Sequence, residues 1–524
     1  MGIYLNPGNS NFIEMVSADI YIDKTMMISE TNRILDTTEK YVCMSRPRRF
    51  GKTYAGNMIS AYYSKGCDSR DLFVNRGIAS DPEFETNLNK YNVIKIDMNS
   101  EYQNTNDKNI LIKRLTEKIR LEMSAEYPNI EFGDDDSVAE SILRIYSATG
   151  DTFIIIIDEY DVLVREQVDQ SLFDEFLSFL NGLFKSDTLR PAISLAYLTG
   201  ILPIVRDKIQ SKLNNFDEYT ILNPGRFTEY VGFTSGEVET LCKQYGIDYD
   251  ECKSWYDGYK LNGYEIYNPE SVVKCIRERY FDSYWGKTSS YKVISDRLEQ
   301  NYKGMKDEIV KMLSGESVDV NITSYLNTMD SFESRNDVFT YLSHLGYLAY
   351  NREEKTCRIP NREILQEWHN AVENNQDYEK TNEIIEASKL LLDETIKGNE
   401  EAVAHALDES HIHVTSNRSY NNEDALQSAI YLAYIYALNK YTVIKEMTTG
   451  KGFADVVYIP FVDDMPALII ELKHNKCAES AIDQIRNRQY FDSLSHYNGE
   501  LLLVGINYDE QTKTHTCKIE RFKK

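Results

Sequence analysis

The apolar run Phe153–Ile157, followed directly by Asp158 and Glu159, constrains the fold of this chain more than any other segment. A continuous run rich in isoleucine, without polar alternation, is typical of a strand buried on both faces, as in a parallel sheet covered by helices. Other short β-rich runs alternate with helical stretches in the N-terminal part of the chain: Tyr41–Met44, Val93–Met98 and Ala192–Leu198. This pattern predicts an N-terminal α/β domain with a mostly parallel sheet.

A basic turn containing Gly51, Lys52 and Thr53 separates the strand expected at Tyr41–Met44 from a helix expected to follow it. The three residues match the end of the phosphate-binding pattern GxxxxGK[ST], whereas Arg46 stands at its first glycine position. A helix N-terminus offers backbone N–H groups to an anion, Lys52 can reach the β- and γ-phosphates, and the Thr53 hydroxyl can bind Mg²⁺. Taken alone, the tripeptide is equally compatible with a simple turn before a solvated helix start.

Asp158 and Glu159 favour the nucleotide interpretation of that turn. We expect Asp158 at the C-terminal end of the strand beside the P-loop strand, where it would hold Mg²⁺ while Glu159 polarises the attacking water. Thr199 follows the strand expected at Ala192–Leu198 and occupies the position of a γ-phosphate sensor. The residues expected to bind ATP are Arg49, Phe50, Gly51, Lys52, Thr53, Asp158 and Thr199.

A second candidate site lies near the C-terminus, where Asp455 is in one expected strand (Phe453–Ile459) and Glu471 in the next (Ala467–Leu472). Neighbouring strands can bring both carboxylates to one edge, and Glu471 and Lys473 point to the same face of their strand. Carboxylate oxygens suit a hard cation such as Mg²⁺ or Mn²⁺. Lys473 is then placed to orient or deprotonate a water for attack on a phosphodiester. The alternative is a surface ion pair at the end of an amphipathic strand.

Two more residues complete this candidate set. Glu423 stands near the start of a helix expected at Glu423–Asn439 and could add an acidic ligand. Gln484 lies in a helix expected at Ala478–Leu494 and could position the water or the backbone. The expected metal ligands in the chain are Thr53, Asp158, Glu423, Asp455 and Glu471, and the expected catalytic residues are Glu159, Asp455, Glu471, Lys473 and Gln484.

The runs Tyr21–Thr25 (YIDKT), Arg46–Thr53 (RPRRFGKT) and Ile157–Asp161 (IDEYD) resemble the AAA-ATPase-like family of bacterial proteins. Later segments fit the same family, among them Trp255–Tyr259 (WYDGY). Arginine at the first glycine position is normal in that family, so the resemblance implies that Arg46 is compatible with nucleotide binding. Family members usually carry a PD-(D/E)XK nuclease-superfamily domain, and the order Asp, Glu-x-Lys, Gln in this chain resembles that fold, whose core is αβββαβ.

The resemblance implies an α/β chain with three parts. Residues 1–270 are expected to form an AAA-ATPase-like P-loop NTPase domain with a lid, and residues 271–405 a mainly helical connecting region. Residues 406–524 are expected to form a PD-(D/E)XK, restriction-endonuclease-like domain with the αβββαβ core.

Composition limits the cellular context and the partners of the chain. Its net charge of −25, from 83 acidic and 58 basic residues, argues against a general nucleic-acid coating protein. From residue 411 onward the two charges nearly balance, so DNA or RNA remains compatible with that segment. The eight cysteines form no CxxC pair, which favours reduced thiols. We expect a cytoplasmic protein, because we see no signal peptide and no apolar stretch of about 20 residues.

The sequence thus predicts an ATP-binding and ATP-hydrolysing P-loop ATPase, coupled to a Mg²⁺-dependent nuclease (with Mn²⁺ as the other candidate metal) that acts on DNA or RNA through the C-terminal domain. The family's domain pairing suggests defence against mobile elements, and the chain could assemble as a homo-oligomer. The alternative is a nucleotide-gated switch or scaffold whose nuclease-like domain binds without cleaving.

Overall fold

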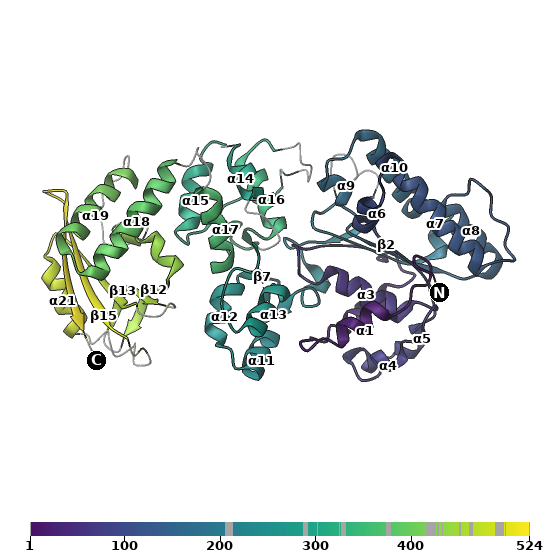
Figure 1. Ribbon diagram of the computed structural model, residues 1–524, viewed down its shortest axis with the longest axis horizontal. Coiled ribbons are helices and arrows are strands. Elements are labelled where there is room, and N and C mark those ends of the chain that lie inside the picture. Colours follow the sequence, from purple (N-terminus) through teal and green to yellow (C-terminus); the bar gives the residue numbers. More distant parts are fainter. Residues whose placement is uncertain are drawn as a thin grey trace. The chain divides into compact units, whose positions relative to one another are not determined.

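The structure is a computed structural model with two compact units (Figure 1). It describes residues 2–522 apart from 205–212, 287–291, 301, 324, 326–331, 374–378, 415–425, 427–428, 432, 450–451, 461–464, 488–496 and 498. The first unit comprises Met1–Tyr284 and Asp319–Asn361, and the second comprises Trp285–Val318 and Arg362–Lys524. The domain boundaries expected after residues 270 and 405 stay predictions.

The first unit is built on a five-stranded sheet in the order β2-β3-β4-β1-β5. Its strands are β1 (Tyr41–Ser45), β2 (Asn92–Asp97), β3 (Phe153–Asp158), β4 (Ile193–Gly200) and β5 (Asp217–Tyr219). Every neighbouring pair is parallel. The four strands expected from the apolar runs are therefore confirmed, and so is the α/β class of this part of the chain.

One expectation about this sheet is wrong. β3, which ends in Asp158, is not beside β1, because β4 lies between them and pairs with both strands. Leu198 of β4 is in register with Cys43 on one side and with Ile157 on the other. The correction does not separate Asp158 from the P-loop, since all strands of a parallel sheet end at the same edge.

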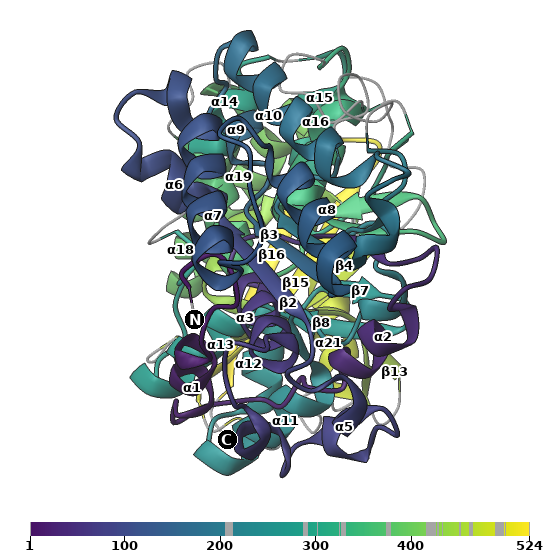
Figure 2. The same cartoon turned by 90° about the vertical axis from the view of Figure 1, so that its right-hand side faces the viewer.

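Helices cover both faces of this sheet, as the uninterrupted apolar run of β3 predicts. On one face α3 (Lys52–Tyr63) packs so closely that a Cβ built on Gly56 would lie 3.6 Å from Cγ2 of Ile156. On the other face Ile155 and Ile157 share a core with α7 (Leu111–Glu126), α8 (Val138–Thr149) and α10 (Gln170–Phe184). α3 and α7 lie on opposite sides of the sheet in both views (Figure 1, Figure 2).

Shorter elements complete the first unit. Its remaining α-helices are α1 (Ser10–Val16), α2 (Met27–Ile34), α4 (Arg70–Phe73), α5 (Phe84–Asn87), α6 (Met98–Asn104), α9 (Val162–Arg165), α11 (Ser235–Tyr245), α12 (Tyr249–Tyr256), α13 (Pro269–Glu278) and α16 (Arg335–Leu345). Short 3₁₀ helices are η1 (Gly77–Ser80), η2 (Lys108–Ile110), η3 (Arg190–Ala192) and η4 (Gly225–Phe227). β6 (Phe233–Thr234), β8 (Tyr264–Tyr267) and β7 (Tyr259–Leu261) form one small sheet, in that order. β10 (Ala349–Asn351), β11 (Thr356–Arg358) and β9 (Val318–Asp319) form another.

The second unit contains a mixed five-stranded sheet in sequential order, β12-β13-β14-β15-β16. The strands are β12 (Tyr441–Thr449), β13 (Gly452–Pro460), β14 (Ala467–His474), β15 (Leu501–Asp509) and β16 (Thr514–Phe522). β14 and β15 are parallel and are connected through α21 (Ala478–Asn487), whereas the other pairs are antiparallel. The described part of this unit also contains the helices α14 (Lys292–Leu298), α15 (Met305–Leu313), α17 (Arg362–Glu373), α18 (Glu379–Lys397) and α19 (Glu400–Val414).

The expected C-terminal strands are confirmed with small shifts of their ends, but two details differ. β16 was not expected, because Thr514–Phe522 is a polar segment whose side chains are mostly half-buried or exposed. The end of the helix expected at Glu423–Asn439 is a 3₁₀ helix, η6 (Ile435–Asn439). Glu423 itself lies outside the described residues. Within the part of the chain that the structure describes, no helix has the length and apolar character needed to cross a bilayer.

Candidate functional site

The loop between β1 and α3 has the backbone form that a phosphate site needs. Gly51 is the N-cap of α3 and has a left-handed φ of 91°. A Cβ built on Gly51 would meet no atom within 4 Å, so the space beside this turn is open. The first turn of a helix leaves backbone N–H groups without intrahelical partners, and these attract anions. The geometry therefore fits a phosphate group at this turn.

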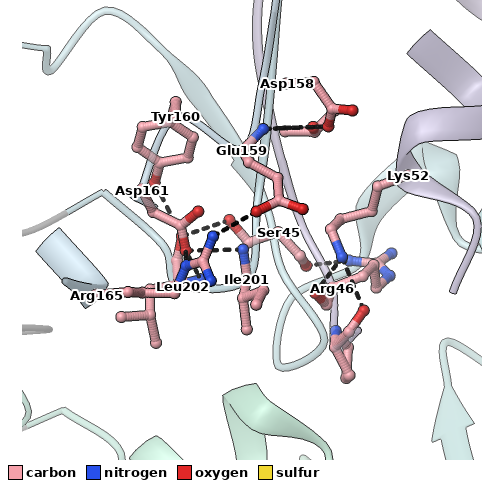
Figure 3. Close-up of polar contacts among 12 residues, drawn as sticks. Ser45, Arg46, Lys52, Asp158, Glu159, Tyr160, Asp161, Arg165, Ile201 and Leu202 are labelled. Atoms are coloured by element: carbon pink, nitrogen blue, oxygen red, sulfur yellow. Dashed lines mark hydrogen bonds and ion pairs between the residues drawn. The ribbon is translucent and has the colours of Figure 1, made fainter. Parts of the chain in front are cut away.

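The Lys52 side chain binds to the backbone of its own loop in this structure. Its Nζ donates to the carbonyl oxygens of Arg46 at 3.0 Å and Pro47 at 2.8 Å (Figure 3). The ammonium is buried, and this burial lowers the pKa of Lys52 to about 8, an effect that the nearby Asp158 carboxylate only partly offsets. Lys52 is therefore a buried cation at the turn, positioned by two carbonyl groups that a phosphate can replace.

Arg46, at the first glycine position of the pattern, has a structural role in this loop. Its side chain is fully buried, and its Nη1 donates to the carbonyl oxygens of Ser45 at 3.1 Å and Tyr219 at 2.9 Å. Burial lowers the pKa of Arg46 to about 10. Because Tyr219 ends β5, the guanidinium ties the end of β1 to the edge strand beside it.

The other loop residues take different positions. The Arg49 guanidinium donates to the carbonyl oxygen of Tyr284 at 3.0 Å. The Phe50 ring is buried, with its centroid 5.5 Å from that of Tyr259, so only its backbone is available to a ligand. Thr53 is exposed at the start of α3, where its hydroxyl is free of the core.

The sheet edge brings Asp158, Glu159 and Thr199 together. Asp158 is the last residue of β3 and is buried, and Thr199 of β4 donates a hydrogen bond from Oγ1 to its Oδ1. The backbone N–H of Glu159 donates to the same Oδ1 at 3.1 Å. Glu159 has a left-handed φ of 51°, which is uncommon for a residue with a Cβ and is often found at functional sites.

Two residues that the sequence analysis did not select hold this edge together. Arg165 of α9 donates from Nη2 to Oε2 of Glu159 at 2.6 Å, and its Nε lies 3.3 Å from Oδ2 of Asp161 (Figure 3). Asp161 Oδ2 also accepts the backbone N–H groups of Ile201 and Leu202, each at 2.9 Å. The spacing of Asp161 and Arg165, four residues apart in a helical turn, was the available signal.

A second pair of contacts fastens the three strand ends to one another. The hydroxyl groups of Tyr160 and Ser45 both donate to the carbonyl oxygen of Leu202, at 2.9 and 3.0 Å. Ser45 ends β1, Tyr160 follows β3, and Leu202 follows β4. The loop, the acidic pair and the sensor position therefore form one cross-linked edge.

Two other segments of the sequence resemblance have structural contacts in the first unit. Lys24 donates from Nζ to Glu237 at the start of α11 and to the carbonyl oxygen of Glu229, each at 2.6 Å. Gly258 has a φ of 114°, and a Cβ there would lie 2.2 Å from the carbonyl oxygen of Pro360. Asp257, beside it, is buried, and burial raises its pKa to about 6.

In the second unit, two neighbouring strands carry the two carboxylates. Val456 of β13 pairs with Ile470 of β14, and Asp455 and Glu471 are the next residues beyond this pair. Because side chains alternate along a strand, both lie on the face opposite to that of Val456 and Ile470. Asp455 Oδ2 also accepts the backbone N–H of Leu472 at 2.7 Å. Asp455 is half-buried.

Glu471 is the centre of this group. It is 1% exposed, and its Oε1 accepts Lys473 Nζ at 3.0 Å and a hydrogen bond from Nε2 of Gln484 in α21. The structure thus brings together four of the five residues expected at this site: Asp455, Glu471, Lys473 and Gln484. The fifth, Glu423, lies outside the described residues.

Both donor sets fit the groups that the sequence predicts. An open glycine turn, a buried lysine and a strand-end aspartate suit a nucleotide with Mg²⁺ in the first unit. Two carboxylates on one face with an ammonium beside them suit a hard cation in the second. Among the residues that the structure describes, no group of three or more His, Cys, Asp and Glu side chains is arranged to hold a metal ion, so a cation here would take further oxygen ligands from elsewhere.

Two family models match the chain. Residues 7–210 match a family described as predicted AAA-ATPase (AAA-ATPase-like), and residues 421–518 match the PD-(D/E)XK nuclease superfamily. The first match contains the loop at Lys52 and the acidic pair after β3, and the second contains Asp455, Glu471 and Lys473. The resemblance noted from the sequence is therefore confirmed for both domains.

More distant comparisons add little to this. The chain is 23% identical over 292 residues to an "Uncharacterized protein in vnfD 5'region" of Azotobacter chroococcum mcd 1, covering 53% of this chain and 52% of that protein. The chain thus spans about half the length of the curated relative it matches. The Aeropyrum pernix ORC2 structure (ADPNP-ADP complexes) is 10% identical, covers 68% of this chain and 96% of that chain, and gives a TM-score of 0.28. The Aeropyrum pernix ORC1 structure in complex with DNA is 10% identical, covers 94% and 99%, and gives 0.26. These two similarities are too weak to support a functional statement.

Proposed function

Because this chain joins an AAA-ATPase-like domain to a PD-(D/E)XK nuclease-superfamily domain, we propose that it is an ATPase whose nucleotide state controls a metal-dependent nuclease. The ATPase assignment rests on the convergence of four residues at one sheet edge: Lys52, Asp158, Glu159 and Thr199. The nuclease assignment rests on two contacts on neighbouring strands: Asp455 accepts the N–H of Leu472, and Glu471 accepts Lys473.

In the ATPase half, Lys52 and the start of α3 bind the phosphates, with the backbone of Arg49, Phe50 and Gly51 shaping the turn. Asp158 and the Thr53 hydroxyl hold Mg²⁺, whose charge balances the phosphates when the nucleotide is bound. Glu159 accepts a proton from water. Thr199 is the sensor of the terminal phosphate, and in this structure its hydroxyl donates a hydrogen bond to Asp158.

In the nuclease half, Asp455 and Glu471 hold a divalent cation (Mg²⁺ or Mn²⁺), to which Glu423 is a further candidate ligand. The bound cation supplies a Lewis acid for phosphodiester hydrolysis. Lys473 orients the attacking water or, once it has lost its own proton, deprotonates it, and Gln484 fixes the Glu471 carboxylate through its amide. The substrate is DNA or RNA, bound by the C-terminal domain.

The domain limits at 1–270, 271–405 and 406–524 belong to the same proposal, as do a cytoplasmic location and assembly of several copies of the chain. Defence against mobile elements is the biological role that the pairing of these two domains favours, by analogy with the family.

The test separates the two activities in the full chain. ATP hydrolysis and cleavage of labelled DNA and RNA are measured with Mg²⁺ or Mn²⁺, with and without ATP. We expect Lys473→Ala to abolish cleavage and leave ATP hydrolysis intact, and Lys52→Ala to abolish ATP hydrolysis. Lys476→Ala, an exchange of a nearby lysine outside the ion pair with Glu471, is the matched control for cleavage.

Each failure has a distinct meaning. Cleavage that survives both Asp455→Ala and Lys473→Ala contradicts the nuclease assignment. Binding of nucleic acid without cleavage by the unaltered chain supports the alternative, a nucleotide-gated scaffold with a non-cleaving nuclease-like domain. If the chain binds ATP without hydrolysing it, the AAA-ATPase-like domain is a nucleotide switch and not an ATPase.

A further inference from the structure

The first unit contains a cavity of about 950 Å³ that belongs to neither of the candidate sites. Its described lining residues come from the segments after β4 and β9, from β5 and the turn that follows it, from α16, and from the β10–β11 hairpin. None of them belongs to the loop at Lys52, to the acidic pair after β3 or to the sensor position. The volume is within the range of pockets that bind small molecules, so we treat the cavity as a separate candidate ligand site.

The cavity lies at the carboxyl edge of the parallel sheet. Pro203 follows β4 and Thr220 follows β5, and both residues line it. Ligands of open α/β sheets bind outside the carboxyl ends of the strands. The cavity therefore occupies a place where a fold of this kind commonly binds a ligand.

Two exposed cations of the β10–β11 turn line the cavity, Arg352 and Lys355. Arg352 Nη1 donates to the neutral amide oxygen of Asn223 at 3.2 Å. Lys355 Nζ has no hydrogen-bond or ion-pair partner among the residues that the structure describes. A phosphate monoester has a charge of about −1.5 to −2 at neutral pH, so two neighbouring cations match one such group.

The same lining offers partners for uncharged donors and for a ring. Glu218 of β5 and Glu354 of the hairpin turn contribute carboxylates, which accept hydrogen bonds from ribose hydroxyl groups and from amino groups of bases. The Asn336 side chain of α16 accepts the backbone N–H of Asn321 at 3.2 Å through its amide oxygen, which leaves its NH₂ group to a ligand. Tyr350 of β10 adds an aromatic ring on which a base can stack.

This mixture of charges separates the ligand classes. A nucleic-acid strand would bring several phosphates against the carboxylates of Glu218, Asp319 and Glu354. An apolar ligand would bury the charged groups without giving them partners. A single ribonucleotide has one phosphate-bearing end and one end with hydroxyl and amino donors, so it suits the cations and the carboxylates at the same time.

We propose that this cavity is a second nucleotide site, which takes a ribonucleoside monophosphate and thereby alters ATP binding at the loop around Lys52; its effect on ATP rests on the proposed function. The connection passes through Tyr219, the last residue of β5, whose carbonyl oxygen accepts Arg46 Nη1 at 2.9 Å. Thr220 and Asn223, joined by backbone hydrogen bonds of 3.0 and 3.2 Å, form the next turn and line the cavity. The Arg46 carbonyl oxygen accepts Lys52 Nζ at 3.0 Å, so a ligand that shifts this turn acts on the phosphate-binding loop.

The first test measures binding of AMP, GMP, CMP and UMP to the full chain by titration calorimetry. The lysine of a P-loop contacts β- and γ-phosphates, so a monophosphate lacks these contacts at Lys52. We expect at least one of the four to bind, with the same Kd in the unaltered chain and in Lys52→Ala. The matching nucleoside and inorganic phosphate should each bind about tenfold more weakly or worse. No binding by any of the four, or equally tight binding of inorganic phosphate alone, overturns the proposal.

Variants of the lining place the binding in the cavity. Arg352→Gln and Lys355→Glu should each raise the Kd of the bound monophosphate about tenfold, the value of one charge-assisted hydrogen bond. Lys260→Glu is the matched control, because Lys260 of β7 is exposed in the same unit and does not line the cavity. All three positions are exposed, and Tm values check that the variants fold. An unchanged Kd in both cavity variants, or an equal loss in Lys260→Glu, overturns the proposal.

The second test measures the Kd of a non-hydrolysable ATP analogue with increasing amounts of the bound monophosphate. Two linked sites change this Kd by a limited factor, so we expect a change of about fivefold that reaches a plateau. The change should disappear in Lys355→Glu. A Kd that rises without a plateau shows competition for one site, and an unchanged Kd shows that the sites are not linked; either result overturns the proposal. If the analogue does not bind at all, the proposed ATPase fails, whereas binding of the monophosphate in the first test still supports the cavity as a nucleotide site.

Discussion

In the first unit, every strand pair of the sheet β2-β3-β4-β1-β5 is parallel, whereas the sheet β12–β16 of the second unit has a single parallel pair. The parallel sheet gathers residues from distant parts of the chain, because its strands all end at one edge. Lys52, Asp158 and Thr199 meet there although about a hundred residues separate the first two. In the second sheet, Asp455 and Glu471 follow directly on the antiparallel pair Val456–Ile470, so two adjacent strands bring them to one place.

The two edges also differ in how they are fixed. In the first unit, Asp161 and Lys52 are bonded to backbone groups of neighbouring strands and loops. In the second, Glu471 is held chiefly by the side chains of Lys473 and Gln484. The first edge is thus held by hydrogen bonds to the backbone. The second is held by hydrogen bonds among side chains that are themselves the candidate catalytic residues.

The largest expected difference in the free energy of unfolding comes from removing one acidic side chain at each edge, Asp161 in the first unit and Asp455 in the second. Asp161→Ala removes the acceptor of two buried N–H groups and one of the two carboxylates beside Arg165, so we expect it to lower the free energy of unfolding by about 4 kcal/mol. Asp455→Ala removes a half-buried carboxylate that accepts the Leu472 N–H, and should cost about 1 kcal/mol. Chemical unfolding of both variants measures the difference. Equal costs would mean that the two edges are built alike.

The second prediction concerns the effect of low pH on a buried histidine of the second unit, His369. His369 in α17 is buried, neither ring nitrogen has a hydrogen-bond partner among the described residues, and burial lowers its pKa to about 4 from an ordinary value near 6.5. The folded state therefore keeps His369 neutral, while the unfolded state binds a proton below pH 6.5. The resulting stability is present above pH 6.5 and is lost as the pH falls to about 4, by about 3 kcal/mol in all.

Hydrogen exchange of the α17 segment between pH 6.5 and 4 is the appropriate measurement, after correction for the intrinsic exchange rate. Its opening free energy should fall in the unaltered chain and stay flatter in His369→Phe. A variant with the same pH dependence as the unaltered chain would show that another group is responsible.

The third prediction compares helix–sheet packing in the two units. A Cβ on Gly505 of β15 would lie 2.4 Å from the carbonyl oxygen of Ala478, so Gly505→Ala should cost about 2 kcal/mol. A Cβ on Gly56 of α3 would lie at an ordinary 3.6 Å from Ile156, and alanine favours helix. Gly56→Ala should therefore stabilise the first unit by up to about 1 kcal/mol. Tm values of the two variants should move in opposite directions.

The smallest effect tests whether a local change stays within the first unit. Ser137 is the N-cap of α8 and forms a capping box with Glu140. Ser137→Ala should lower the stability of the first unit by about 1 kcal/mol. Hydrogen exchange should speed up in α8 and remain unchanged in β12–β16. Faster exchange in both places would show that the two units unfold together.

Much of the fold was predictable because its signals are local. The apolar run of β3 identifies a buried strand wherever the rest of the sheet lies, and Gly51 identifies a turn because a left-handed φ suits glycine. The strand order was predicted wrongly, since β3 and β4 have similar apolar sequences and nothing local says which of them pairs with β1. β16 was missed because its pattern is polar and its pairing with β15 depends on tertiary contacts.

The candidate sites show the same division. Lys52, Asp158, Asp455 and Lys473 stand out because phosphate and metal chemistry needs those residue types at strand ends. Arg165 did not stand out, because its four-residue spacing from Asp161 indicates an ordinary helical ion pair and not a function. Its position between Glu159 and Asp161 follows only from the way the chain turns after β3.

The amino-acid sequence by itself determined that this chain has a parallel α/β part with a phosphate-type turn and a second part with two acids and a lysine in adjacent strands. Hydrophobic periodicity and the conformational needs of glycine act over a few residues, so they can be read without coordinates. Tertiary structure alone decided that β4 separates β1 from β3, that Glu471 receives both Lys473 and Gln484, and that Arg165 binds Glu159. These contacts join residues through strand pairing, helix packing and burial, which depend on the whole folded chain.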